Sequence, residues 1–89
     1  MAVVTLRAPL KDRADGNDRL ELPGASVGEV LLELEARFPK VVGWILDEHG
    51  KVRPHVNVFV TGEKVREDAP VGDRDRIHVL PSISGGAEA

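Results

Sequence analysis

The sequence predicts an α+β fold in which one main helix packs across one face of a mixed sheet of four to five strands. A helical pattern over residues 26–38 lies between two blocks whose apolar and polar residues alternate as they do in strands. With 89 residues the chain has room for one domain with one modest core. A single helix between two such blocks can bury its apolar stripe only by crossing a sheet.

The first block predicts a β-hairpin. Residues 2–8 alternate so that Val4 and Leu6 share one face, which is the pattern of a half-buried strand. The polar stretch 11–18 contains Asp-Gly-Asn, a turn signal, and residues 20–22 then resume the alternation. One face of this hairpin is therefore apolar.

The helix is predicted from its start signal, its stripe and its stop signal. Ser26 and Glu29 have the spacing of a capping box, which satisfies two backbone N–H groups of the first turn. Pro39 ends the helix, because proline disfavours helical geometry in the residue before it. The apolar run 41–46 predicts a brief second helical turn that packs Trp44 beneath the sheet. The stripe consists of Val27, Val30, Leu31, Leu34 and Phe38.

The second block predicts two strands and a tail. Residues 55–60 place three valines on the core face and Phe59 on the other, and residues 63–71 are rich in turn formers. In the last strand, 75–80, Ile77 and Val79 point inward while His78 and Leu80 point outward.

This element order is that of a β-grasp roll, in which the first and last strands lie side by side in parallel. The chain thus divides into a β-grasp domain over residues 1–81 and a flexible C-terminal tail over residues 82–89. The tail contains the diglycine Gly85-Gly86, followed by a three-residue extension.

Composition argues against several classes of function. The 12 Lys and Arg residues against 15 Asp and Glu give a net charge of −3 with no basic block, so we expect no nucleic-acid partner. Cysteine is absent and no histidine pair has helical i, i+4 spacing, so we expect no metal site and no catalytic residues. The N-terminus has no secretory leader and no window could cross a bilayer, which favours a cytoplasmic protein without a membrane partner.

Residues 73–86, Asp-Arg-Asp-Arg-Ile-His-Val-Leu-Pro-Ser-Ile-Ser-Gly-Gly, resemble the ending of the MoaD/ThiS family of ubiquitin-like sulfur carriers. That ending is typically Asp-Gly-Asp, an apolar strand, a proline, a small apolar segment and Gly-Gly. Residues 55–60 and 62–66 are similar to the family's middle strand and turn. The similarity covers nearly the whole chain and is greatest to the branch that carries sulfur for cysteine biosynthesis.

The resemblance implies a carrier that is a co-substrate of partner enzymes and not itself an enzyme. In the family an adenylating enzyme, related to ubiquitin-activating enzymes, uses ATP to activate the carboxylate of the last glycine. A sulfur donor then makes a thiocarboxylate, which a sulfur-accepting synthase consumes, and the carrier itself binds no cofactor. Gly86 would carry the sulfur. Gly85, which has no side chain, would let the tail enter a narrow active-site channel. Leu80, Phe59 and Ile83 would contact partners.

Two departures from the family pattern matter. Arg74 replaces the glycine of the Asp-Gly-Asp turn, which should affect the geometry of that turn. Residues 87–89 follow the diglycine, so the Gly86 carbonyl lies in a peptide bond and offers no carboxylate to activate. We expect a JAMM-type metalloprotease to cut between Gly86 and Ala87. The competing interpretation is a copy that has lost carrier function and only binds a partner.

Two further hypotheses come from other classes of protein. The chain could be a protein modifier whose Gly86 forms isopeptide bonds with lysines. It could also be a non-catalytic interaction domain, such as a small subunit similar to that of molybdopterin synthase. Formation of lysine-linked conjugates would favour the first, and stable co-purification with an uncleaved tail would favour the second.

Overall fold

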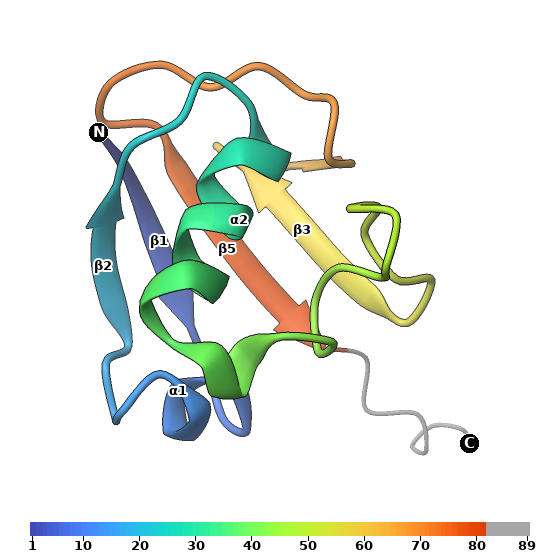
Figure 1. The fold of residues 1–89 in the computed structure, drawn as a ribbon. Coiled ribbons are helices and arrows are strands. Elements are labelled where there is room, and N and C mark those ends of the chain that lie inside the picture. Colours follow the sequence, from blue (N-terminus) through green and yellow to red (C-terminus); the bar gives the residue numbers. More distant parts are fainter. Residues whose placement is uncertain (82–89) are drawn as a thin grey trace.

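The computed structural model describes residues 1–81, which form a five-stranded mixed sheet with one long helix across one face (Figure 1). The strand order is β2-β1-β5-β3-β4. The predicted α+β roll is therefore confirmed. The elements are β1 (Ala2–Leu6), α1 (Leu10–Arg13), β2 (Arg19–Leu22), α2 (Val27–Arg37), the 3₁₀ turn η1 (Pro39–Val41), β3 (Val56–Val60), β4 (Glu63–Val65) and β5 (Arg76–Pro81).

Strand β5 occupies the centre of the sheet. It pairs in parallel with β1, with Val4 opposite Ile77 and Leu6 opposite Val79, and antiparallel with β3 on its other side. The predicted parallel pairing of the first and last strands is thus confirmed. Because both edges of β5 are hydrogen-bonded, the strand that leads into the tail is held more firmly than an edge strand would be.

The core lies between α2 and the face of the sheet that α2 covers. Val60 on β3 is half-buried and packs against the core. The other inward residues of β1 and β3, together with Ile77 and Val79 of β5, are fully or almost fully buried, as the alternation predicted. Four of the five stripe residues of α2 are equally buried, and Phe38 packs against the core while remaining half-buried. The buried side chains of this contact are Val4, Leu6, Val27, Val30, Leu31, Leu34, Val56, Val58, Ile77 and Val79.

Helix α2 begins at the predicted cap. The Glu29 N–H donates to Ser26 Oγ at 3.2 Å, as a capping box requires. The Glu29 carboxylate, however, accepts from the N–H of Ala25 at 2.9 Å, one residue before the cap. The helix ends at Arg37, before Pro39, as predicted.

The prediction that Trp44 packs beneath the sheet is wrong. Its side chain is 39% exposed, and Cζ of Arg13 lies 3.7 Å from the centroid of the indole ring. Gly43, at φ +88°, turns the backbone just before it, and Ile45 and Leu46 occupy the core positions instead. The regular turn in this region is η1, which begins at Pro39 and ends before most of the apolar run.

Two short elements were not predicted. The polar connection of the first hairpin contains α1, whose Leu10 is fully buried, together with Ala14 after it. The turn-rich stretch 63–71 contributes the edge strand β4, which pairs with β3 through a two-residue turn at Thr61 and Gly62. Both turn residues have positive φ, as a tight hairpin turn of this twist requires.

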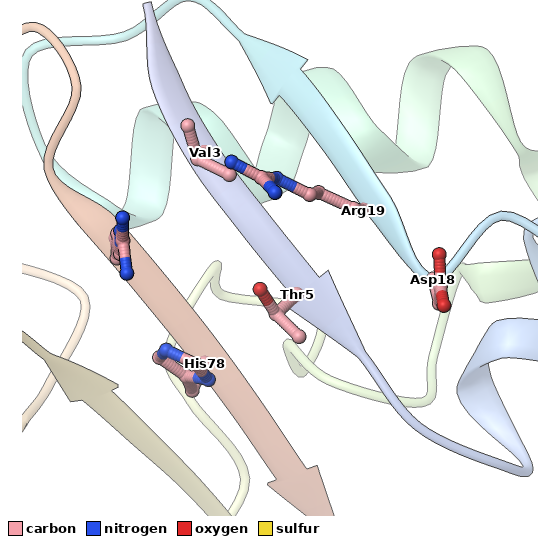
Figure 2. Close-up of a pocket in the computed structure, with 6 residues that line it drawn as sticks. Val3, Thr5, Asp18, Arg19 and His78 are labelled. Carbon is pink, nitrogen blue, oxygen red and sulfur yellow. The ribbon is translucent and has the colours of Figure 1, made fainter.

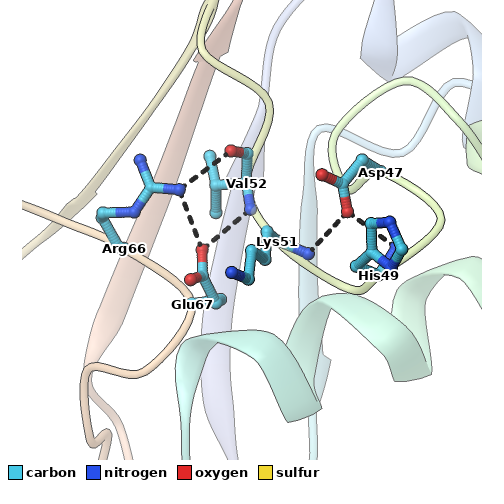
Figure 3. A network of polar contacts seen from close by, with 6 residues as sticks. All are labelled: Asp47, His49, Lys51, Val52, Arg66 and Glu67. Atoms are coloured by element: carbon cyan, nitrogen blue, oxygen red, sulfur yellow. Dashed lines mark hydrogen bonds and ion pairs between the residues drawn. The ribbon is translucent and has the colours of Figure 1, made fainter.

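A polar network holds the loop between η1 and β3 (Figure 3). One carboxylate oxygen of Asp47 accepts the N–H groups of His49, at 2.8 Å, and of Lys51, at 3.0 Å. The N–H of Lys51 lowers the pKa of Asp47, with a smaller contribution from that of His49, because both bonds favour the ionised form.

The same loop is hydrogen-bonded to Arg66 and Glu67, which follow β4 in the sequence. Oε1 of Glu67 accepts the N–H of Val52 at 2.8 Å, and the guanidinium of Arg66 donates to the carbonyl oxygen of Val52 at 3.3 Å. The bond from Val52 lowers the pKa of Glu67 below its usual range. A carboxylate whose pKa is lower in the folded protein than in the unfolded chain stabilises the fold at pH values above the unfolded pKa. This stabilisation is lost as the pH falls through the pKa of the folded protein.

Candidate functional site

The tail leaves the domain from the central strand. Pro81, the last residue of β5, is paired with Val56 at the start of β3. Four residues predicted for adenylation, processing and partner binding lie outside the described residues, so their roles remain predictions. They are Ile83, Gly85, Gly86 and Ala87. What the structure describes is the surface that leads to the tail.

That surface is the face of the sheet opposite α2, which we call the open face. The registers place five outward residues in one cross-strand row: Arg19, Thr5, His78, Phe59 and Lys64. Directly opposed side chains of neighbouring strands lie close enough to contact one another. The open face therefore presents a continuous band of side chains across all five strands.

The half of the open face nearer the tail is partly apolar. Phe59 lies opposite His78, and Leu80 is one outward position further along β5, so Phe59 and Leu80 are diagonal neighbours. Both are half-buried, and together with Arg7, Gly62 and His78 they line a shallow hollow of about 330 Å³. The predicted outward orientation of both residues is confirmed, and their role in binding remains a prediction.

The other half of the open face is cationic. Figure 2 shows Arg19, Thr5 and His78 around a second hollow, which is also lined by Val3, Asp18 and Arg76 and has a volume of about 260 Å³. The alternation of the strands places 19 and 76 on this face. Sequence reasoning nevertheless missed them as a group, because residues 57 positions apart become neighbours only through the pairing of β2, β1 and β5.

The turn that precedes β5 contains Arg74 in a left-handed conformation, with φ +70°. Its N–H donates to the carbonyl oxygen of Met1 at 2.8 Å, and the N-terminal ammonium of Met1 lies 2.7 Å from Oδ1 of Asp73. The hydrogen bond and the charge of that ammonium lower the pKa of Asp73. Glycine adopts a positive φ easily, which explains why it suits this position in the Asp-Gly-Asp turn of the family that the sequence resembles.

Within residues 1–81, no three His, Asp or Glu side chains come together as a group that could hold a metal ion. No helix in the same range has both the length and the apolar character needed to cross a bilayer.

A family model described as the ThiS family matches residues 4–86. The chain belongs to the ThiS family. Relatives of this ThiS-family chain are small ubiquitin-like carrier and modifier proteins.

Two curated relatives and one solved structure illustrate the similarity. Small archaeal modifier protein 3 of Haloferax volcanii is 36% identical over 66 residues, covering 70% of this chain and 71% of that protein. The sulfur carrier protein CysO of Mycobacterium tuberculosis is 29% identical over 91 residues, covering 93% and 98% respectively. A chain of the Amycolatopsis orientalis BexX/CysO complex superposes with a TM-score of 0.87 at 28% identity, covering 97% of this ThiS-family chain and all of that chain.

Proposed function

We propose that this chain is a ubiquitin-like sulfur carrier whose C-terminal glycine, once exposed, is activated by a partner enzyme and loaded with sulfur. The observation that carries the proposal is the family match, which ends on Gly86, the second residue of the diglycine. The tail with this dipeptide follows directly from β5, the central strand, which is paired on both of its edges. A carrier needs such a terminus and little other chemistry of its own.

The chemistry proceeds in two substitutions. A carboxylate oxygen of Gly86 attacks the α-phosphorus of ATP, so that an acyl-adenylate forms and pyrophosphate leaves. A donor at the oxidation level of hydrosulfide then attacks the acyl carbon, the bond to AMP breaks, and a thiocarboxylate remains. No oxidant or reductant is consumed with such a donor. The carrier's contribution is a terminus without side chains, which can enter a narrow active site.

The three residues after Gly86 must be removed before the first substitution, because a peptide carbonyl cannot act as the nucleophile. We propose that a metalloprotease of the JAMM type cleaves the bond between Gly86 and Ala87. The similarity to sulfur carrier proteins named CysO supports cysteine, or another sulfur-containing metabolite, as the final product. A sulfur-accepting synthase would be the second partner.

Docking of the adenylating enzyme is assigned to the apolar half of the open face. Leu80 and Phe59 are half-buried on that face, and the tail begins at the end of the strand that carries Leu80. Leu80→Glu places a charge in this contact and should weaken binding at least tenfold while leaving the melting temperature unchanged. Leu32→Glu is the matched control, because Leu32 is 52% exposed on α2, away from the open face.

The decisive experiment compares three forms of the protein: the full chain, a chain ending at Gly86, and a chain ending at Gly85. Each is incubated with the adenylating enzyme of the same organism, ATP and hydrosulfide, and then analysed by intact-mass spectrometry. Only the chain ending at Gly86 should exchange one oxygen for sulfur. The proposal fails if that chain is unchanged, or if the full chain is loaded equally well without loss of residues 87–89.

A second candidate function is protein modification, which the 36% identity to small archaeal modifier protein 3 favours. In that case the activated carbonyl of Gly86 would form an isopeptide bond with a lysine, releasing AMP. Expression of an N-terminally tagged chain in its host would then give higher-mass conjugates that resist thiols. Conjugates that disappear in a Gly86→Ala strain would support modification, whereas a thiocarboxylate without conjugates would support sulfur transfer alone.

A further inference from the structure

The open face carries arginines that have no ion-pair partner among residues 1–81. Its hollows are lined by Arg7, Arg19, Arg74 and Arg76, against the carboxylates of Asp18 and Glu21. Within residues 1–81 none of these four guanidinium groups makes an ion pair or donates a side-chain hydrogen bond to the protein. The arginine that pairs most closely with a carboxylate, Arg37, lies on α2 instead.

This arrangement separates charge across the molecule. The whole chain carries a net charge of −3, yet the open face has an excess of positive charge. Helix α2 on the opposite side carries Glu29, Glu33 and Glu35. A positive face on a negative protein orients the molecule in the field of a negatively charged partner, and such steering raises association rates.

The cationic and apolar parts of the open face are continuous. His78 lines both the hollow that contains Arg19 and Arg76 and the hollow that contains Phe59 and Leu80. Along β5 the outward residues follow one another as 76, 78 and 80, ending at the start of the tail. A partner that receives the tail therefore meets the apolar part first, and the arginines lie where its surface extends further over the sheet.

We propose that Arg19 and Arg76 bind an acidic surface patch on the protein that activates the tail, beside the apolar contact of Phe59 and Leu80. This inference rests on the proposed function for the identity of that partner. The observations favour a protein over a nucleic acid. Two carboxylates lie among the arginines, and an apolar patch adjoins them, whereas nucleic-acid sites present long basic tracks with aromatic stacking platforms.

The two parts of the surface have separable kinetic roles. Exposed charges at the rim of an interface act chiefly on the association rate and its dependence on salt, whereas apolar anchors act on the dissociation rate. Arg19→Gln/Arg76→Gln should therefore lower the association rate constant about tenfold at low salt and flatten its salt dependence. Leu80→Ala, which removes apolar contact without adding a charge, should instead raise the dissociation rate constant.

The kinetic test uses the chain ending at Gly86 and the adenylating enzyme of the same organism, in stopped-flow measurements at several salt concentrations. Lys40→Gln/Lys51→Gln is the matched control, since it removes the same charge from exposed residues in η1 and in the loop between η1 and β3, outside the strands of the open face. The inference holds if only the arginine pair slows association. It is overturned if both double variants slow association equally, or if neither does.

A second measurement separates this inference from the proposed function. Short poly-glutamate and a single-stranded oligonucleotide are titrated into the labelled protein, and backbone amide shifts are followed by NMR. Shifts confined to the strands of the open face, lost in the arginine variant, support an acidic protein partner even if the adenylating enzyme does not bind. Tighter binding of the oligonucleotide through the same arginines would overturn it in favour of nucleic acid.

Discussion

Replacement of Leu34 by alanine tests the contact on which the fold depends, the packing of α2 against the sheet. The Leu34 side chain is fully buried at the centre of the helical stripe. Its truncation removes apolar contact and leaves a cavity, and such changes lower the free energy of unfolding by about 2–5 kcal/mol. Because a small domain has only about 5–15 kcal/mol in total, the loss is a large fraction of its stability.

The effect should appear as a lower melting temperature, by roughly 8–40 °C, since 1 kcal/mol corresponds to about 4–8 °C in a domain of this size. Thermal unfolding followed by circular dichroism provides the measurement. Leu32→Ala is the matched control, because Leu32 is on the same helix but 52% exposed, and its replacement should change stability by no more than about 0.5 kcal/mol. Equal melting temperatures for the two variants would refute the assignment of Leu34 to the core.

Three further substitutions test the backbone and the polar network, each by thermal unfolding. Gly24→Ala should destabilise by about 1–3 kcal/mol, because its Cβ would lie 2.6 Å from Cγ2 of Val30, and a stability equal to wild type would contradict this. Arg74→Gly should stabilise by up to about 1 kcal/mol by relieving its φ of +70°; a lower melting temperature would contradict this. Glu67→Gln should flatten the loss of stability as the pH falls below the ordinary pKa of a glutamate, because protonation of Glu67 weakens the bond from Val52. An unchanged pH dependence of stability in acid would refute that role.

The parts of the fold that could be predicted from the sequence are those with a clear period. Alternation in 75–80 placed Ile77 and Val79 inward and Leu80 outward, and the structure agrees. The stripe and cap of α2 were predictable for the same reason, because a helix of 11 residues repeats its pattern several times. The tail motif was recognisable because its residues are adjacent in the sequence.

The features that sequence reasoning missed lack such a period. Helix α1 has only four residues, too few to show a repeat, so burial of Leu10 gave no signal. The run 41–46 is apolar throughout, and only the turn at Gly43 decides that Trp44 stays outside while Ile45 is buried. Arg19 and Arg76 line the same hollow because β1 pairs with both β2 and β5, which the spacing of residues along the chain does not reveal.

Strand β5 carries both core residues and residues proposed for partner recognition, because its side chains alternate. Ile77 and Val79 are fully buried against the core, whereas Arg76, His78 and Leu80 line the open face. Successive residues of a strand point to opposite faces, so a change at an outward position leaves the core packing intact. Substitutions at 76, 78 and 80 should therefore change the proposed partner contacts without loss of the fold. The same strand ends at Pro81, just before the tail in the sequence, so under the proposed function one partner both binds this face and receives the terminus.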